Sequence, residues 1–366
     1  MGFAFIKHDT NIDFIGWRHW AYGISTVLLL AGLASALWGN GLKMGIDFAG
    51  GVIVQVRFDK PVNDEALKKS LDIPALPGIT TQRFGEGGRD YLLRFSSAEN
   101  ADASALRANV INALASAFPD NAAEIQRLEV VGPKVGGDLT NKALSALYYA
   151  VLLIAVYISG RFEQRWMAGA IMAAALWGGM YVLGFTGLSM GWLVMTALAI
   201  TMVVCFFLRL NFALGAVVGL LHDVLVTAGL LSIMNVEIDL NVMAALLTLV
   251  GYSLNDTIIV YDRLRENLRA APQLDLAALI NRSVNQTLSR TILTSGTTFV
   301  ATLSLFLLGG GVIHDFALTM LIGVFVGTAS SIYVSSAILL RLGNTEFYVR
   351  AQEKEKYDRP GEHGVV

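Results

Sequence analysis

Two acidic residues lie inside apolar segments that are long enough to cross a membrane. Asp256 belongs to the segment Gly251-Tyr-Ser-Leu-Asn-Asp-Thr257, and Asp223 follows His222 near the middle of another apolar segment. A charge at the centre of a bilayer costs at least roughly 2.5–3.5 kcal/mol, so an acidic residue there needs a partner or water. A carboxyl group in such a place can carry a proton by alternating between its neutral and ionised forms.

The neighbours of Asp256 predict a polar face on its helix. Thr248, Tyr252 and Asp256 are spaced four residues apart and therefore share one side of a helix, with Asn255 beside them. Such a face can lie against water or against polar groups of a neighbouring helix.

Hydroxyl side chains recur at helical spacing in the span that Arg290 begins: Thr291, Thr294, Ser295, Thr298 and Thr302. Opposite Asp256, this stripe predicts a file of water through which the carboxyl exchanges protons. Arg290 would then favour the ionised form of Asp256. The alternative is a structural ion pair between Asp256 and Arg290 that locks the two helices together.

The adjacent pair His222 and Asp223 allows two interpretations. Imidazole beside a carboxylate can form a proton relay. Adjacent residues on a helix point about 100° apart, however, so the two side chains are not expected to face one common partner. The residues alone therefore favour a hydrogen bond inside the helix bundle. The spacings Gly215–Gly219 and Gly323–Gly327 indicate close helix packing nearby.

The composition indicates a membrane protein. Of 366 residues, 54% are hydrophobic and only 15% are charged, whereas soluble chains have about a quarter charged residues. The 27 basic and 29 acidic residues give a net charge of −2, so no basic field indicates nucleic-acid binding. The single cysteine, Cys205, excludes an intramolecular disulfide. No nucleotide motif, metal-ligand spacing or nucleophile–base arrangement is found, so we expect neither a cofactor nor enzyme activity.

Apolar stretches predict an α-helical membrane protein with about eight spans. They lie at 20–38, 143–159, 166–186, 191–208, 212–232, 240–260, 291–312 and 316–340. Lys and Arg gather in the loops on one side, whereas the opposite short loops have none, which predicts that both termini are cytoplasmic. We expect a first span within 1–38, an exterior domain over 39–142, a bundle over 143–341 and a cytoplasmic tail over 342–366.

The exterior segment predicts one α+β domain with a ferredoxin-like fold. Strand patterns at 51–58, 79–84, 91–95 and 124–131 alternate with helical patterns at 64–71 and 100–118. The resulting βαββαβ order is that of a split βαβ domain. Glycines between the first span and the first strand predict a tight backbone turn there.

The segment from Gly251 to Asn267, which reads GYSLNDTIIVYDRLREN, closely resembles the signature of the SecF family of bacterial protein-export membrane proteins. The resemblance extends over nearly the whole chain in the family's order. It includes Gly45–Gly51, Val131–Gly136, Arg161–Glu163, Leu221–Asp223 and Asn285–Thr291. The resemblance implies a partner of SecD in a twelve-span, RND-type unit that uses the proton gradient to promote late steps of protein export.

The resemblance also assigns residues and partners. The family's membrane carboxylate matches Asp256, its transmembrane arginine matches Arg290, and its His-Asp element matches His222 and Asp223. Tyr252, Asn255, Thr294 and Thr298 complete the expected proton pathway, and the structural motif after the first span is Asp47, Phe48, Gly50 and Gly51. Further implied partners are SecYEG, YajC, YidC, the exported polypeptide and lipid of the bacterial inner membrane.

One feature departs from the family, whose members usually have six spans. About 45 residues separate Arg161–Glu163 from His222–Asp223, which is enough for two additional crossings. We expect the hairpin at 166–208 to lie at the edge of the bundle. The echo of Arg161-Phe-Glu in Arg209-Leu-Asn is consistent with a duplicated hairpin or with chance similarity. Two other functions stay open, namely a proton-driven RND exporter of small apolar molecules and an inert scaffold.

Overall fold

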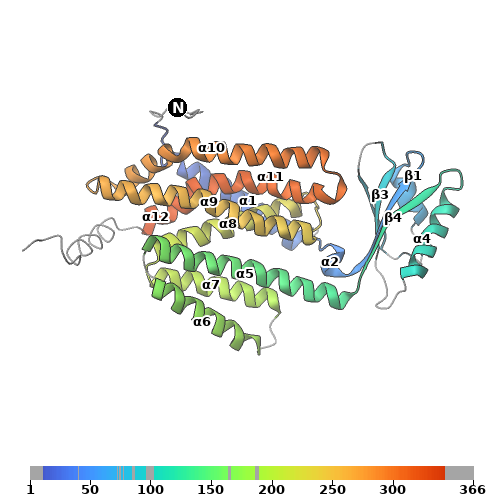
Figure 1. The fold of residues 1–366 in the computed structure, drawn as a ribbon, viewed down its shortest axis with the longest axis horizontal. Coiled ribbons are helices and arrows are strands. Elements are labelled where there is room, and N and C mark those ends of the chain that lie inside the picture. The colour runs from blue at the N-terminus through green and yellow to red at the C-terminus, as the bar shows by residue number, and fades with distance from the viewer. Residues whose placement is uncertain are drawn as a thin grey trace, which may run out of the picture.

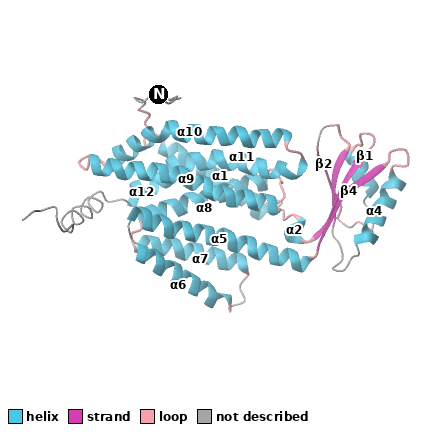
Figure 2. Ribbon diagram, viewed as in Figure 1, coloured by secondary structure: helices cyan, strands magenta, loops and turns pink. Residues whose placement is uncertain are grey.

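The chain folds into a bundle of long helices with a small sheet domain at one end (Figure 1). The computed structural model describes residues 11–39, 41–71, 73, 76, 78–84, 87–95, 103–163, 166–185 and 189–342. Figure 2 shows that the strands are confined to the end of the molecule beyond α2, while the rest is helical. The expected combination of a membrane helix bundle with one α+β domain is confirmed.

The exterior domain has the predicted βαββαβ order. Its elements are β1 (Gly51–Phe58), α3 (Asp64–Leu71), β2 (Thr80–Phe84), β3 (Asp90–Phe95), α4 (Ala103–Ala117) and β4 (Ala123–Val131). The strand order is β2-β3-β1-β4, and all neighbouring strands are antiparallel. Alternate residues of β1, including Val52, Val54 and Val56, are completely buried against α3 and α4. The predicted helix start at residues 100–102 lies outside the described residues.

A tight turn connects the bundle to β1. The short helix α2 (Ile46–Ala49) ends at Gly50 and Gly51, whose φ angles are 77° and 142°. Residues with a Cβ rarely adopt these values, which explains the pair of glycines. The turn lies against α5 (Pro133–Glu163), where a Cβ on Gly136 would come within 2.6 Å of the backbone oxygen of Phe48.

Seven helices of the described chain are long and apolar enough to cross a membrane. These candidate spans are α1 (Arg18–Trp38), α5 (Pro133–Glu163), α7 (Met190–Phe207), α8 (Asn211–Ile233), α9 (Leu240–Ala270), α10 (Leu276–Leu308) and the continuous segment Ile313–Leu342. That segment comprises most of α11 (Gly311–Ser330), the π-helical turn η1 (Ser331–Ser335) and α12 (Ser336–Leu342). The eighth predicted span corresponds to α6 (Trp166–Gly184), which has a shorter apolar stretch at Trp166–Gly179.

Helices α9 and α10 extend well beyond the predicted spans. The apolar stretches predict 240–260 and 291–312, whereas α9 continues to Ala270 and α10 begins at Leu276. The extensions pack against each other through side-chain hydrogen bonds, such as those from Asn267 to Ser283 and Gln286. Hydropathy identifies only the apolar part of a helix, so polar helical turns outside the membrane escape it.

Helix α1 crosses α8 at two glycines. Gly32 and Gly229 lie so close that a Cβ on either would come within 2.7 Å of the other's Cα. The hydroxyls of Ser35 and Ser232 are 2.9 Å apart beside this crossing. In contrast, α6 and α7 form a hairpin that packs along α5 on one side of the bundle (Figure 1). Large hydrophobic side chains such as Trp177 and Trp192 are exposed on this hairpin, as expected for a surface that faces lipid.

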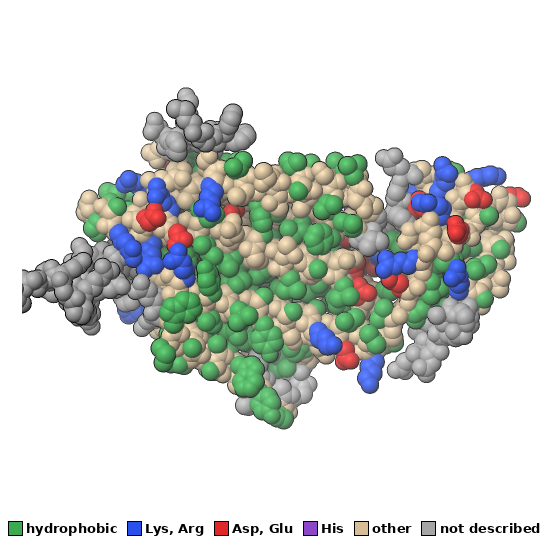
Figure 3. All heavy atoms as spheres, viewed as in Figure 1, with side chains coloured by type: hydrophobic (Ala, Val, Ile, Leu, Met, Phe, Trp, Pro, Cys, Tyr) green, Lys and Arg blue, Asp and Glu red, His purple; other side chains and the backbone are tan. Residues whose placement is uncertain are grey.

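The two ends of the bundle differ in charge. Figure 3 shows Lys and Arg gathered at the end far from the sheet, with a few acidic side chains among them. Between the bundle and the sheet, acidic side chains lie beside other Lys and Arg. The broad surface between them on this face has mainly hydrophobic and uncharged side chains. Residues 11–17, before α1, lie at the end far from the sheet, where the Ile12 backbone N–H donates to Asn285, and α12 lies at the same end (Figure 1).

Candidate functional site

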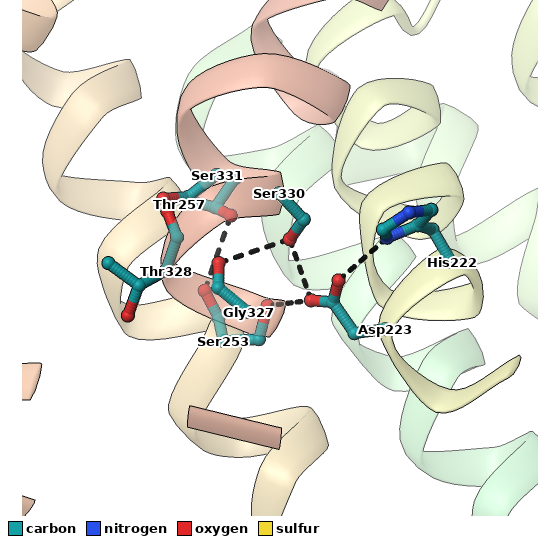
Figure 4. Close-up of polar contacts among 8 residues, drawn as sticks. All are labelled: His222, Asp223, Ser253, Thr257, Gly327, Thr328, Ser330 and Ser331. Atoms are coloured by element: carbon teal, nitrogen blue, oxygen red, sulfur yellow. Dashed lines mark hydrogen bonds and ion pairs between the residues drawn. The ribbon is translucent and has the colours of Figure 1, made fainter. Parts of the chain in front are cut away.

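Asp223 lies at the centre of a polar cluster inside the bundle (Figure 4). Its side chain is 1% exposed, and its Oδ2 accepts hydrogen bonds from Ser253 of α9 and from Ser330 of α11, the latter at 2.8 Å. The Oδ1 atom lies 3.0 Å from Nδ1 of His222. Three helices therefore meet at one carboxyl group, and each contributes a polar side chain.

Glycine allows this close approach. Gly327 of α11 lies against the cluster, where a Cβ would come within 3.1 Å of Cβ of Ser253 and 3.5 Å of Oδ2 of Asp223. Gly323, one turn earlier, packs on Leu249 of α9 in the same way. The predicted packing role of the Gly323–Gly327 spacing is thus realised directly beside a buried carboxyl group.

The structure places His222 against Asp223. The sequence predicted that the two side chains, about 100° apart on the helix, would not face a common partner. The two side chains contact each other, while Oδ2 of Asp223 accepts from Ser253 and Ser330 on other helices. The other ring nitrogen, Nε2, is buried and has no hydrogen-bond partner among the described residues.

Asp256 lies one helical turn from Ser253 on α9 and forms a second polar cluster. Its side chain is 1% exposed, and its Oδ2 accepts a 3.1 Å hydrogen bond from Ser295 of α10. The Ser295 hydroxyl also lies 2.8 Å from that of Thr328 in α11. Within the part of the chain that the structure describes, Oδ1 of Asp256 is buried without a hydrogen-bond partner. A buried carboxyl with one unpartnered oxygen has room to hold a proton on that atom.

Arg290 acts on Asp256 through its charge without forming an ion pair. The arginine is exposed, and no ion pair joins the two residues among those described. The predicted alternative, an ion pair that locks α9 to α10, is therefore absent from this conformation. Thr294 faces the same carboxyl, although its hydroxyl also reaches the backbone oxygens of Arg290 and Thr291 at 3.0 Å.

The other predicted pathway residues lie at varying distances from this cluster. Tyr252 packs against the cluster of Ala245, Met320 and Val324, and its hydroxyl is buried without a partner among the described side chains. Asn255 is exposed on the outer side of α9. Thr248 is exposed as well and donates to the backbone of Ala244 at 2.7 Å. Only some of the residues on the predicted polar face of α9 are therefore buried near Asp256.

Residues of the last span complete both clusters, and sequence reasoning missed them. Thr328 contacts Ser295, and Ser330 donates to Asp223. The sequence does contain a signal, because the stretch from Gly327 to Ser336 reads GTASSIYVSS inside an otherwise apolar span. Hydroxyl groups that are concentrated in one part of a membrane helix commonly bond neighbouring helices.

A third polar region joins the exterior domain to the bundle. Arg94 of β3 forms an ion pair with Glu237 in the loop between α8 and α9. The backbone N–H of Leu240, at the start of α9, donates to Asp47 of α2 at 3.0 Å. The loop and the segment before α2 also exchange backbone hydrogen bonds, from Gly45 to Ile238 and from Ile238 to Lys43, each 2.8 Å. The helices that carry the two buried carboxyls are therefore tied to the sheet.

Acidic groups crowd this junction. A cavity of about 250 Å³ is lined by Arg94, Glu237 and Asp239 among other residues. Burial raises the pKa of Asp239, and the neighbouring carboxylates Asp47 and Asp315 raise it further, against the lowering effects of the Val242 N–H and of Arg94. No group of His, Cys, Asp and Glu among the described residues has the arrangement of a metal site.

The fold and these sites define a class of protein. The chain is a multi-pass α-helical membrane protein with one ferredoxin-like domain outside the bundle and two buried carboxyl groups within it. The family model described as "Protein export membrane protein SecD/SecF, C-terminal" matches residues 110–190 and 188–345. The model described as "SecD/SecF GG Motif" matches residues 35–62, which include Gly50 and Gly51.

Curated relatives cover nearly the whole length of the chain. The protein translocase subunit SecF of Escherichia coli O157:H7 is 36% identical over 359 residues, which cover 97% of this chain and 96% of the relative. SecF of Magnetococcus marinus is 41% identical over 339 residues, with 92% and 93% coverage. The chain belongs to the SecF family of protein translocase subunits.

Solved structures agree with this assignment. The crystal structure of SecDF from Thermus thermophilus, a translocon-associated membrane protein, matches with a TM-score of 0.66 and 30% identity. The match covers 92% of this chain and 39% of that chain, so the chain spans about two fifths of the longer protein. SecDF in a super-membrane-facing form matches with a TM-score of 0.53 and 31% identity.

Proposed function

We propose that this chain associates with SecD in the bacterial inner membrane and uses the proton motive force to promote late stages of protein export. The observation that carries the proposal is the burial of Asp256 without full hydrogen bonding. Its carboxyl group is buried at the level of the membrane spans, has one oxygen without a partner, and is not neutralised by an ion pair within the described chain. A purely structural scaffold gains little from such a group, because a hydrophobic residue would pack there at lower cost.

The charge distribution supports an orientation with both termini in the cytoplasm. Residues 11–17 and α12 lie at the end of the bundle where Lys and Arg gather (Figure 3). The sheet domain lies at the other end and would then be periplasmic, which suits a contact with a polypeptide that emerges outside.

The junction connects the helices that carry the two buried carboxyl groups to the exterior domain. Asp223 and Asp256 lie on α8 and α9, and the loop between these helices is bonded to β3 and α2 through Arg94 and Asp47. A change in the packing of α8 against α9 would therefore displace the base of the sheet domain. Through SecD, we propose further association with SecYEG, YajC and YidC, as the family resemblance implies.

The experiment that tests this function compares export into vesicles that contain this chain, SecD and the translocon, with and without a proton gradient. Asp256→Asn keeps the shape of the side chain and removes its charge change, so the gradient should no longer stimulate export. The matched control is Asp262→Asn on the same helix, because that carboxylate pairs with Arg161 at the partly exposed end of the bundle. Equal stimulation in the Asp256→Asn variant and the unmodified chain would refute the proposal.

A further inference from the structure

The last span contacts Asp223 directly and reaches Asp256 through one bridging hydroxyl, both within three residues. Ser330 donates to Asp223, and Thr328 reaches Asp256 through the hydroxyl of Ser295. Directly after these residues, the helix changes from α to π over Ser331–Ser335. Short π-helical turns are uncommon and occur frequently at functional sites.

The hydroxyl of Ser330 has two acceptors and one proton. Oδ2 of Asp223 lies 2.8 Å away, and the backbone oxygen of Gly327 lies 3.1 Å away (Figure 4). When Asp223 is ionised, a charge-assisted bond to the carboxylate is the stronger choice. When Asp223 holds a proton, it attracts this donor less, and the hydroxyl turns to the carbonyl of its own helix.

At Asp256, protonation reverses the donor and acceptor roles along the hydrogen bonds through Ser295 and Thr328. An ionised Asp256 accepts from Ser295, which then accepts from Thr328. When the proton of Asp256 lies on Oδ2, the carboxyl can donate to Ser295, so that Ser295 donates to Thr328 and Thr328 donates to the Val324 carbonyl at 2.8 Å. Protonation at either site therefore turns a hydroxyl of α11 away from the carboxyl group or its bridging serine, and this hydroxyl then donates to a backbone carbonyl of α11.

Bonds from Ser and Thr to carbonyls one turn earlier bend helices. Here they would act at the last α-helical turn before the π-helix. The π-helical turn itself sits in a groove of small residues, since a Cβ on Gly219 of α8 would come within 2.3 Å of Oγ of Ser335. The Tyr261 hydroxyl of α9 donates to the backbone oxygen of Ser335 at 3.4 Å. The turn thus contacts the two helices that carry the carboxyl groups.

We propose that Thr328–Ser335 is a proton-sensing joint in the last span, and that Ser330 is the positioning residue that ties it to Asp223. The proposal rests on the proposed function in that it supplies the element on which protonation acts. The groups that face Asp223 are His222 on its own helix and the neutral hydroxyls of Ser253 and Ser330. Those that face Asp256 are Arg290, Thr294 and Ser295.

The test is amide hydrogen exchange of Ser331–Leu342 in the full chain with SecD in lipid bilayers, over a pH series. Rates are divided by the intrinsic rates of unstructured peptides at each pH. Loss of a charge-assisted bond in favour of a neutral one should speed exchange of the π-helical turn on the order of tenfold when the carboxyls become protonated. Asp223→Asn and Ser330→Ala should both remove the part of the pH response that depends on Asp223.

Ser331→Ala is the matched control, because the Ser331 hydroxyl donates to the backbone of Thr328 and to neither carboxyl. This variant should keep the pH dependence. The proposal is overturned if exchange in the unmodified chain does not respond to pH, or if Ser330→Ala responds as the unmodified chain does. It is also overturned if Ser331→Ala abolishes the response equally, because turn stability alone would then explain it.

The readout does not depend on export, so the two proposals can fail separately. If export ignores Asp256→Asn while exchange at the turn still follows pH, the proposed function is wrong and the joint stands. If export requires Asp256 but exchange ignores pH, the joint alone is wrong.

Discussion

The contact between α2 and α5 can be tested with two neighbouring glycines of one helix. Gly136 and Gly137 both lie in the first turns of α5. A Cβ on Gly136 would come within 2.6 Å of the backbone oxygen of Phe48, whereas a Cβ on Gly137 meets nothing within 4 Å. The pair therefore separates the effect of the contact from the effect of removing a glycine from a helix.

The magnitude follows from two opposing terms. Replacing Gly by Ala inside a helix stabilises it by roughly 0.5–1 kcal/mol, and this term is common to both variants. The Gly136→Ala variant must also displace the backbone of α2, and overpacking of this kind costs about 1–3 kcal/mol. The two variants should therefore differ by about 1–3 kcal/mol, with Gly137→Ala the more stable.

Amide hydrogen exchange of the segment from α2 to β1 measures this difference in the full chain. Exchange through local opening should be about 5- to 150-fold faster in Gly136→Ala than in Gly137→Ala. The glycine pair at the turn should gain mobility together with α2, since Gly50 is packed against Pro133 at the start of α5. Equal exchange in the two variants would mean that α2 does not rest on α5, and the account of how the sheet is held on the bundle would be wrong.

Three further predictions concern the exterior domain and its junction with the bundle. Burial and its contact with Asp64 raise the pKa of Tyr91 to about 12, so the domain should lose stability as pH rises through about 10 to 12, and Tyr91→Phe should cost about 1 kcal/mol in denaturant unfolding. Burial raises the pKa of Asp239, so its ionised form disfavours the folded junction, and the stability of the junction should fall as pH rises above the usual carboxyl value of about 4. Asp239→Asn keeps the helix cap and should flatten this pH dependence, as measured by hydrogen exchange at the start of α9. Removing either partner of the Arg94–Glu237 pair should speed exchange in β3, and a double-mutant cycle should give a coupling energy of about 0.5–3 kcal/mol; strictly additive effects would show that the pair does not join the domain to the bundle.

The exterior domain could be predicted almost residue by residue. Strand β1 was expected at 51–58 and lies at Gly51–Phe58, and the helix at 64–71 likewise agrees. Short strands with alternating burial and turn-forming residues between them give a strong local signal. The positive φ angles of Gly50 and Gly51 agree with the tight turn that the sequence predicted there.

The surroundings of the carboxyl groups could be predicted only in part. Asp223, Asp256 and Ser295 are evident from the sequence because polar residues are rare in apolar spans. The contribution of Ser330 was missed, since the sequence does not reveal which face of α11 meets α8. The π-helical turn was missed for a related reason, because its backbone depends on packing against Gly219 and Tyr261 and not on local propensity.

Proton flux measures most directly whether Asp256 exchanges protons between the two sides of the membrane, as we propose. Vesicles that contain this chain and SecD would receive an imposed pH difference, and an enclosed dye would report the proton influx. The Asp262→Asn variant should conduct protons as the unmodified chain does, because its carboxylate lies at the partly exposed end of the bundle beside Arg161. Asp256→Asn should reduce the flux to that of vesicles without the complex. Unchanged flux in the Asp256→Asn variant, with the complex intact, would contradict the account.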